Sequence, residues 1–563
     1  MNAGETRDRR GVLAAVAGVV AGGLGLAVSE LVAAVVAPGA STIFAGGAAV
    51  VDVVPPWLKD FAVAWFGTAD KAVLLGTMGV VLAAGAALAG WLERRRRHVG
   101  VALLVLVGVA GMVLAATRPG AGPLWVLPSA IGVAVAIPVL RASIRTLLPD
   151  AAATATATAA TAAAATAGAT EGPASAEEPA ATGRSADVAA ASPAPGATAP
   201  DGPRPPAPSS AVNRRRFLQI TGLAAAGALV ALGASQVIGA GARTVEAVRT
   251  RLRLPAPARA AAPVPAGAEL GIDGLTPYVV PNDEFYRIDT ALRVPQINPE
   301  DWTLRVTGMV DEPFEIGWDE LVSLPLTEHH VTLACVSNPV GGDLIGNALW
   351  LGYPVRDLLA RARPQAGADM VLSTSQDGWT AGTPLEVLED PDRECLLAIG
   401  MNGELLPAQH GFPARLVVPG LYGYVSATKW VTELKVTTFE QDEGYWTPRG
   451  WSALGPVKLH SRIDVARAAE GGGALVAGVA WAQHTGVSAV EVMADDGDWV
   501  PAELAQATGT DTWVQWRAEL DLAPGDHTVT VRATDANGEV QTAEVAPPAP
   551  DGATGWHSAS VTV

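Results

Sequence analysis

Four long apolar segments near the start of the chain restrict its fold more than any other feature of the sequence. They cover residues 11–37, 72–92, 99–117 and 124–140 and consist mainly of Ala, Gly, Val and Leu. Each has roughly the 20 residues needed to cross the hydrocarbon core of a bilayer. Buried helices of a soluble protein are the alternative, but such long runs with few charges are typical of membrane spans. The sequence therefore predicts an all-α membrane domain over residues 1–150.

Basic residues around these segments predict the orientation of the domain. They form three clusters, namely Arg7, Arg9 and Arg10, then Arg94 to Arg97, and then Arg141 and Arg145. All three fall on one side of the predicted membrane, which the positive-inside rule makes the cytoplasmic side. Residues 41–66 are then expected outside, as a re-entrant or interfacial segment. Glu30, within the first span, is either a candidate intramembrane site or a helix-end residue that reaches the interface.

A fifth span with an unusual start follows a region of low complexity. Residues 151–212 contain mostly Ala, Thr, Pro, Gly and Ser, which favours a disordered cytoplasmic linker. The next segment, 213–242, begins with Asn213-Arg214-Arg215-Arg216-Phe217-Leu218. The pattern Arg-Arg-x-Phe-Leu resembles a twin-arginine export signal, and a plain positively charged flank is the alternative. Such a signal predicts export of a folded, cofactor-containing protein, and five crossings place residues 243 onward outside the cytoplasmic membrane.

The charge of the chain differs between its two parts. Residues 1–250 contain 19 basic and 14 acidic side chains, whereas residues 251–563 contain 19 and 42, a net charge of −23. This acidic part excludes a nucleic-acid partner, because phosphate binding requires a positive surface. Two cysteines, Cys335 and Cys395, allow at most one disulfide, so a hydrophobic core has to stabilise the exported part.

The exported part is predicted to contain a stalk and two domains. A Pro- and Ala-rich stalk covers residues 243–269, and a domain with both strands and helices covers residues 270–445. The elements expected there include strands at 302–306 and 414–418 and a helix at 355–362. Regularly spaced short strands in the last part, 446–563, predict a β-sandwich. These strands are expected at 474–481, 489–493, 512–517 and 527–533.

Cys335 is the first candidate for chemistry in the exported part. It follows an apolar run typical of a strand and precedes the glycine pair Gly341-Gly342. A free cysteine is often a simple core residue. A thiolate, however, is also the ligand that a soft or high-valent metal requires. The glycine-rich segment 341–347 favours the second interpretation, because glycines let a backbone approach a ligand closely.

His410 and Arg415 form a second candidate, in a turn-rich segment over residues 406–415. An imidazole and a guanidinium together suit an anionic phosphate or pterin group. A structural turn with a surface salt bridge is the alternative. Of the eight histidines, His98 alone lies in the predicted membrane domain, which excludes a membrane haem held by two histidines.

Several motifs in the second part together resemble the sulfite oxidase family of molybdopterin enzymes, over residues 270–563. The matching residues are Phe285-Tyr286-Arg287-Ile288-Asp289, Leu304-Arg305-Val306-Thr307-Gly308, the segment around Cys335, Trp350-Leu351-Gly352, Met401-Asn402-Gly403, residues 410–415, Val418-Pro419-Gly420 and Lys429-Trp430. The resemblance implies an α+β molybdopterin-binding domain over 270–445 and an immunoglobulin-like dimerisation domain over 446–563. A homodimer is implied as well.

The resemblance also implies roles for individual residues. Cys335 would supply the one protein thiolate to molybdenum. Arg287 and Tyr445 would be catalytic, with Arg287 binding an oxyanion substrate and Tyr445 assisting by proton transfer or a hydrogen bond. The residues expected to bind the molybdopterin cofactor are Arg287, Asp289, Asp377, His410, Arg415 and Lys429.

Departures from the family limit what the resemblance implies. The residues after Cys335, Ser337-Asn338-Pro339-Val340-Gly341-Gly342, lack the arginine pair of the animal and plant enzymes, which argues against sulfite as substrate. The sequence also lacks a b-type haem domain, so the electron-transfer partner is open. We expect a multi-pass enzyme of the cytoplasmic membrane that performs oxygen-atom transfer or a related two-electron reaction on a small molecule outside. The alternatives are a hydrolase with Cys335 as nucleophile and His410 as base, or a non-catalytic envelope binding protein.

Overall fold

The computed structural model describes residues 3–36, 38–55, 58, 65–66, 70–118, 121–148, 210–238, 247–469 and 471–563. The predicted linker lies outside these residues except for its last three positions. Contacts divide the chain into two compact units. The first comprises Met1–Val36, Gly76–Val113 and Val126–Ser235, and the second comprises Ala37–Leu75, Leu114–Trp125 and Gln236–Val563.

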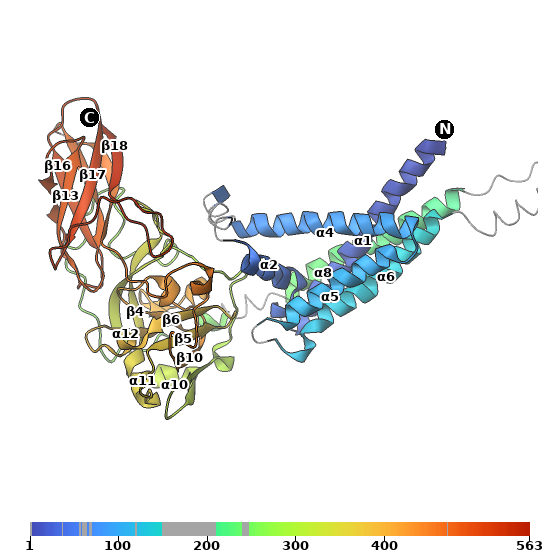
Figure 1. Cartoon of the computed structure of the whole chain (residues 1–563), viewed down its shortest axis with the longest axis horizontal. Coiled ribbons are helices and arrows are strands. Elements are labelled where there is room, and N and C mark those ends of the chain that lie inside the picture. Colours follow the sequence, from blue (N-terminus) through green and yellow to red (C-terminus); the bar gives the residue numbers. More distant parts are fainter. Residues whose placement is uncertain are drawn as a thin grey trace, which may run out of the picture. The chain divides into compact units, whose positions relative to one another are not determined.

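The first unit consists mainly of long apolar helices, which are labelled in Figure 1. The ends of three of them, residues 70–75, 114–116 and 236–238, belong to the second unit. They are α1 (Ala3–Val36), α4 (Asp70–Arg95), α5 (Val99–Ala116), α6 (Leu127–Leu147) and α8 (Ser210–Ile238). In the described part of the chain, these five helices are long and apolar enough to cross a membrane. The five predicted apolar segments are thus confirmed as long apolar helices, apart from residues 37 and 239–242, which lie outside the described residues.

Small residues let these helices pack closely. A Cβ atom built on Gly18 of α1 would lie 2.0 Å from the carbonyl oxygen of Ala86 in α4. A Cβ on Gly90 would in turn lie 2.0 Å from the carbonyl oxygen of Ala14. Glycine is therefore required where α1 and α4 cross, as is common between helices in membranes.

One further apolar helix belongs to the second unit. This helix, α2 (Thr42–Val53), has 12 residues and begins after Ser41, whose hydroxyl accepts a hydrogen bond from the amide of Phe44 at 3.2 Å. A helix of this length is too short to cross a bilayer.

Two sheets form the centre of the second unit. The first has the order β2-β1-β10-β5-β6, in which β1 and β10 are parallel and the other pairs antiparallel. Its strands are β1 (Thr303–Gly308), β2 (Phe314–Gly317), β5 (Met370–Ser375), β6 (Thr380–Pro384) and β10 (Val431–Thr437). The second sheet has the order β3-β4-β7-β8, and β9 pairs with β7. Its strands are β3 (Thr327–Ala334), β4 (Ile345–Pro354), β7 (Leu396–Met401), β8 (Glu404–Leu405) and β9 (Arg415–Val417).

Short helices cover these sheets and share one large core with them. They are α10 (Trp318–Ser323), α11 (Val355–Ala362) and α12 (Leu385–Glu389). The predicted bounds of α11 are confirmed. Its buried residues Val355, Leu358, Leu359 and Ala362 follow the spacing i, i+3, i+4, i+7 of an amphipathic helix.

The last part of the chain forms two four-stranded antiparallel sheets around a common core. Figure 1 labels four of their strands, β13, β16, β17 and β18. One sheet has the order β11-β12-β16-β15 and the other β14-β13-β17-β18. The strands are β11 (His460–Ala468), β12 (Ala474–Trp481), β13 (Val487–Ala494), β14 (Val500–Pro501), β15 (Glu503–Leu504), β16 (Val514–Leu520), β17 (Asp526–Asp535) and β18 (His557–Thr562). The predicted β-sandwich and its four expected strands are therefore confirmed.

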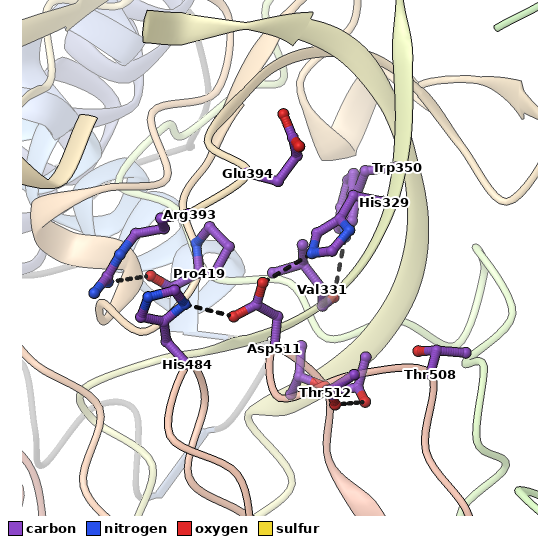
Figure 2. A network of polar contacts seen from close by, with 12 residues as sticks. His329, Val331, Trp350, Arg393, Glu394, Pro419, His484, Thr508, Asp511 and Thr512 are labelled. Carbon is purple, nitrogen blue, oxygen red and sulfur yellow. Dashed lines mark hydrogen bonds and ion pairs between the residues drawn. The ribbon is translucent and has the colours of Figure 1, made fainter. Parts of the chain in front are cut away.

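Polar contacts join strand β3 to two loops of the sandwich. Figure 2 shows the carboxylate of Asp511 between the rings of His329 and His484, whose N–H groups donate to it at 2.8 and 3.1 Å. The amide of Thr332 donates to the Asp511 carbonyl at 2.9 Å. Burial disfavours the ionised carboxylate, but the hydrogen bonds and charges of the two histidines outweigh this and hold the pKa of Asp511 below its usual value. Asp511 thus fixes the sandwich to the strand that leads to Cys335.

We expect Asp511→Asn to lower the free energy of unfolding of the full chain by about 2 kcal/mol at pH 7, a typical loss for a hydrogen bond to a charged group. Because the pKa is lowered in the folded state, the contribution is complete above the unfolded pKa of about 3.9 and disappears as the pH falls through the folded pKa. Denaturant unfolding in detergent at several pH values measures this. The exposed Asp392 provides the control Asp392→Asn. If Asp511→Asn lowered the free energy of unfolding equally at all pH values, the result would contradict an electrostatic origin of this stabilisation.

Candidate molybdopterin site

Cys335 directly follows strand β3. Its amide donates to the carbonyl of Leu344 at 2.9 Å, and its Sγ lies 2.9 Å from the hydroxyl oxygen of Ser337. The side chain is partly exposed, and both Cys335 and Cys395 are free. Burial raises the pKa of the Cys335 thiol, while the hydrogen bond to Ser337 and the charge of Lys429 oppose this rise. A bound metal ion would deprotonate such a thiol, so Cys335 is suited to be a ligand rather than a free nucleophile.

Contacts within the protein already require glycine at two positions after Cys335, whereas the glycine-rich pattern of segment 341–347 predicts the approach of a ligand. Gly341 has φ 76°, and a Cβ built on it would lie 2.4 Å from Nε2 of His557 in the sandwich. A Cβ on Gly346 would lie 2.8 Å from the ring of Phe285. The close approaches that require glycine are thus to side chains of the protein itself.

His410 is held in its orientation by the loop before the Phe285 motif. Its Nε2–H donates to the carbonyl of Asn282 at 2.9 Å, and its ring packs edge-on against Phe285 with centroids 5.6 Å apart. Burial and the charge of Arg415 lower the pKa of His410 to about 4. The imidazole is therefore neutral at pH 7, and its Nδ1 is a hydrogen-bond acceptor.

Asn402 positions that loop from the turn between β7 and β8. Its side-chain amide donates to the carbonyl of Val280 and to Oδ1 of Asn282, both at 2.9 Å, and its own Oδ1 accepts from the amide of Leu349. Asn402 has φ 52° and Gly403 has φ 79°, a combination that suits the Asn-Gly pair of a two-residue hairpin. The Met401-Asn402-Gly403 motif thus supports the site indirectly, through the turn.

Arg415 begins strand β9 and is a buried cation with 5% exposure. Its guanidinium donates to the carbonyls of His410 and Leu416, each at 3.3 Å, and lies 5.0 Å from the ring centroid of Trp350. In the part of the chain that the structure describes, it forms no ion pair with a carboxylate. Burial lowers the pKa of Arg415 to about 10, so it stays charged at neutral pH. A buried cation of this kind is suited to an anionic partner.

Lys429, Arg287 and Asp289 form an ion-pair cluster beside this arginine. Nζ of Lys429 and Nε of Arg287 each lie 2.9 Å from Oδ2 of Asp289. Lys429 also donates to the carbonyl of Gln409, next to His410, at 3.2 Å. Burial lowers the pKa of Lys429 to about 8, although Asp289 opposes this. Burial also disfavours ionised Asp289, but Lys429 and further cations hold its pKa below the usual range.

Asp377 and Tyr445 lie at the hairpin of β5 and β6. Asp377 is exposed in the turn, and its carboxylate accepts a hydrogen bond from the amide of Trp379 at 3.2 Å. The amide of Tyr445 donates to the carbonyl of Thr380 at 3.0 Å. The guanidinium of Arg449 lies 3.7 Å from the centroid of the Tyr445 ring. Among the described residues, neither Asp377 nor Tyr445 makes a side-chain hydrogen bond to Cys335 or Arg415.

Tyr286 is a residue near Cys335 that the sequence did not single out. Burial raises its pKa, the charge of Cys335 acts in the same direction, and Arg415 opposes both. Its ring stacks on Phe285 with centroids 5.2 Å apart. The signal available in the sequence was its place between Phe285 and Arg287 in the quoted motif.

Comparison with known proteins identifies the family of this domain. Residues 291–446 match the family model described as oxidoreductase molybdopterin binding domain. An alignment of 322 residues is 29% identical to mitochondrial sulfite oxidase of Rattus norvegicus and covers 48% of this chain and 58% of that protein. The matched residues belong to the sulfite oxidase-like molybdopterin oxidoreductases.

Other relatives of this molybdopterin-binding domain are nitrate reductases. The NADH nitrate reductase of Solanum lycopersicum is 31% identical over 178 residues, which cover 27% of this chain and 19% of that protein. One from Arabidopsis thaliana is 33% identical over the same length. The chain thus spans about a fifth of the nitrate reductases that it matches. Among solved structures, the sulfane dehydrogenase SoxCD from Paracoccus pantotrophus has a TM-score of 0.44 and 21% identity, covering 52% of this chain and 82% of that chain.

The residues of the molybdopterin-binding domain fit the cofactor. Arg415 and Lys429 are buried cations suited to an anionic phosphate, and neutral His410 adds a hydrogen-bonding group. The thiol of Cys335, which interacts electrostatically with Lys429, offers the sulfur that a soft or high-valent metal requires. Within the described ranges, no group of three or more His, Cys, Asp or Glu side chains could hold a metal ion. A cofactor bound here would supply further ligands to a metal at Cys335.

Proposed function

We propose that the chain is a membrane-anchored molybdopterin oxidoreductase that transfers an oxygen atom, or performs a related two-electron reaction, on a small molecule outside the cytoplasmic membrane. Sulfur and nitrogen oxides are the proposed substrate class. The observation that supports this most is the buried Arg415 within the matched domain, which pairs with no carboxylate among the described residues and shares the buried neighbour Tyr286 with Cys335. Such a site suits an anionic cofactor with a metal, and it does not suit a cysteine hydrolase.

In this proposal, Cys335 is the protein ligand of the metal, and the cofactor supplies the two-electron redox chemistry. Arg415, Lys429 and His410 hold the pterin and its phosphate. Asp289 keeps Lys429 charged and in place through their 2.9 Å ion pair. Asp377, which is exposed in its turn, belongs to this set by family resemblance alone.

Arg287 and Tyr445 are the proposed catalytic residues. The Arg287 side chain is 40% exposed, while its Nε is fixed by Asp289, so the rest of the guanidinium can receive an oxyanion. Burial raises the pKa of Tyr445 to about 12, with the charge of Asp52 as the second cause. The phenol therefore stays neutral at neutral pH and can assist the reaction by a hydrogen bond or by proton transfer.

The domain organisation, the membrane topology and the partners of the chain are also part of the proposal. Residues 1–150 and 213–242 would cross the membrane five times, residues 151–212 would link these parts in the cytoplasm, and residues 243–269 would form a stalk outside. The β-sandwich after the catalytic domain would be immunoglobulin-like and form a homodimer. Lipid and an electron-transfer partner of unknown kind complete the proposed set of partners.

A turnover assay tests the proposed reaction. Detergent-solubilised full chain, made in a host that synthesises the cofactor, is supplied with an artificial electron carrier and screened with sulfite, sulfoxides and N-oxides. The proposal predicts carrier-linked conversion of at least one oxide or its reduced partner. Protein that contains the cofactor but converts none of these would contradict the proposed substrate class.

Replacing both Arg214 and Arg215 with lysine tests the export signal. We expect the variant to keep its first four spans inserted and to leave the catalytic domain in the cytoplasm, because lysine preserves the positive charge but not the arginine pair. Protease added outside intact cells should then cleave the catalytic domain of the wild type only. Equal cleavage of both proteins would show that these arginines act only as a positively charged flank.

A further inference from the structure

Two short stretches between the long helices belong to the same compact unit as the molybdopterin-binding domain. These outer segments are Ala37–Leu75, which contains α2, and Leu114–Trp125. Three of their charged residues, Asp52, Lys71 and Arg118, make ion pairs within this unit.

Asp52, near the end of α2, binds the proposed catalytic tyrosine. The hydroxyl of Tyr445 donates to Oδ1 of Asp52 at 3.0 Å. Nη1 of Arg118 lies 3.0 Å from Oδ2 of the same carboxylate, and Nη2 of Arg449 lies 3.8 Å from Oδ1. The two arginines stabilise the charge of Asp52, and Arg449 also lies over the tyrosine ring. The carboxylate is thus held where it fixes the direction of the hydroxyl.

Lys71 makes a second, independent contact with the site. Its Nζ lies 2.8 Å from Oδ1 of Asp289 and donates to the carbonyl of Ala291 at 2.7 Å. Asp289 is 5% exposed and also pairs with Lys429 and Arg287. Two residues of one outer segment, Asp52 and Lys71, therefore contact two parts of the proposed active site. These parts are Tyr445 and the ion-pair cluster that contains Arg287.

We infer that Asp52 is a positioning residue for the reaction, which it serves by accepting the hydrogen bond of the Tyr445 hydroxyl. This inference rests on the proposed function, because it takes Tyr445 as catalytic. The phenolic proton then points to Asp52, and the phenolic oxygen keeps its lone pairs as acceptors. Through Asp52, α2 is accordingly part of the enzyme's active site and not only a connection between spans.

Nitration of Tyr445 tests the contact without any substrate. Tetranitromethane reacts with phenolate, and the groups that act on Tyr445 are Asp52, Arg449 and Arg118. Without the Asp52 charge the phenol ionises more easily. Each unit by which its pKa falls raises the phenolate fraction about tenfold. We expect Asp52→Asn and Asp52→Ala to accelerate nitration at pH 8 at least about threefold. The tryptic peptide 436–449 contains Tyr445 as its one tyrosine, so mass spectrometry measures this site alone.

Two controls and a pH profile separate the possible outcomes. Asp52→Glu should keep nitration as slow as in the wild type, because it keeps the carboxylate. Asp521→Asn, at an exposed position of the sandwich, should leave the nitration rate of Tyr445 unchanged. In turnover, Asp52→Asn should move the alkaline limb of kcat/KM to lower pH. Nitration that does not respond to Asp52, or an unmoved alkaline limb, would overturn the inference. Normal turnover by Tyr445→Phe would instead refute the catalytic role of Tyr445, while the nitration result still reports on the contact.

Discussion

Cys335→Ser is expected to abolish turnover, with a loss of at least about 100-fold, because a loss of this size already follows when groups that merely support a metal ligand are removed. Serine has nearly the size of cysteine but is a poor ligand for a soft or high-valent metal. The side chain is partly exposed and its only side-chain hydrogen bond in the described structure is to Ser337. We therefore expect the free energy of unfolding to change by less than about 1 kcal/mol.

The measurement is turnover per chain together with the metal content of the same preparation. Cys395→Ser is the matched control, because Cys395 is free but buried away from the site. That variant should keep its metal and its turnover. Normal turnover by Cys335→Ser would contradict the assignment of Cys335 as the metal ligand.

Arg415→Met is expected to weaken cofactor retention by about 10- to 100-fold, the equivalent of losing charge-assisted hydrogen bonds worth about 1.5–3 kcal/mol. The apoprotein should respond differently. Removing a buried cation relieves its desolvation, which offsets the lost hydrogen bonds to the carbonyls of His410 and Leu416. We expect the unfolding free energy of the apoprotein to change by no more than about 1 kcal/mol.

Cofactor retention is measured as the pterin released from purified protein. The stability of the apoprotein is measured by denaturant unfolding of the cofactor-free protein. Arg415→Lys should fall between wild type and Arg415→Met, because lysine keeps the charge but lacks the guanidinium fork. Arg517→Met, at an exposed site in the sandwich, is the surface control. A large destabilisation of the apoprotein with normal cofactor content would make Arg415 a structural residue.

The parts of the fold that depend on local patterns could be predicted from the sequence. Length and apolar composition were sufficient for the five long helices, and regular strand spacing was sufficient for the sandwich. The helix at 355–362 was predicted with its observed bounds, because its apolar positions repeat at helical spacing. The cluster of His410, Arg415 and Lys429 followed from resemblance to a family, since spacing alone left a structural turn as an alternative.

Contacts between distant parts of the chain could not be predicted. The partner of Tyr445, Asp52, comes 393 positions earlier, and no local pattern connects the two. The glycine at 341 was interpreted as an approach to a ligand, but the close neighbour is His557, which reaches it only because the sandwich packs there. Tyr286 was overlooked because its burial and its proximity to Cys335 depend on the folded loop.

Molybdenum content tests the central claim most directly. Full-length protein is purified in detergent from a host that synthesises the cofactor, and its metal is measured by elemental analysis beside pterin fluorescence after oxidation. We expect about one molybdenum and one pterin per chain, because Cys335 would be the one protein thiolate bound to the metal. Repeated preparations of folded protein without molybdenum and pterin would contradict the proposed enzymatic function. They would favour a binding protein that keeps the fold without the cofactor.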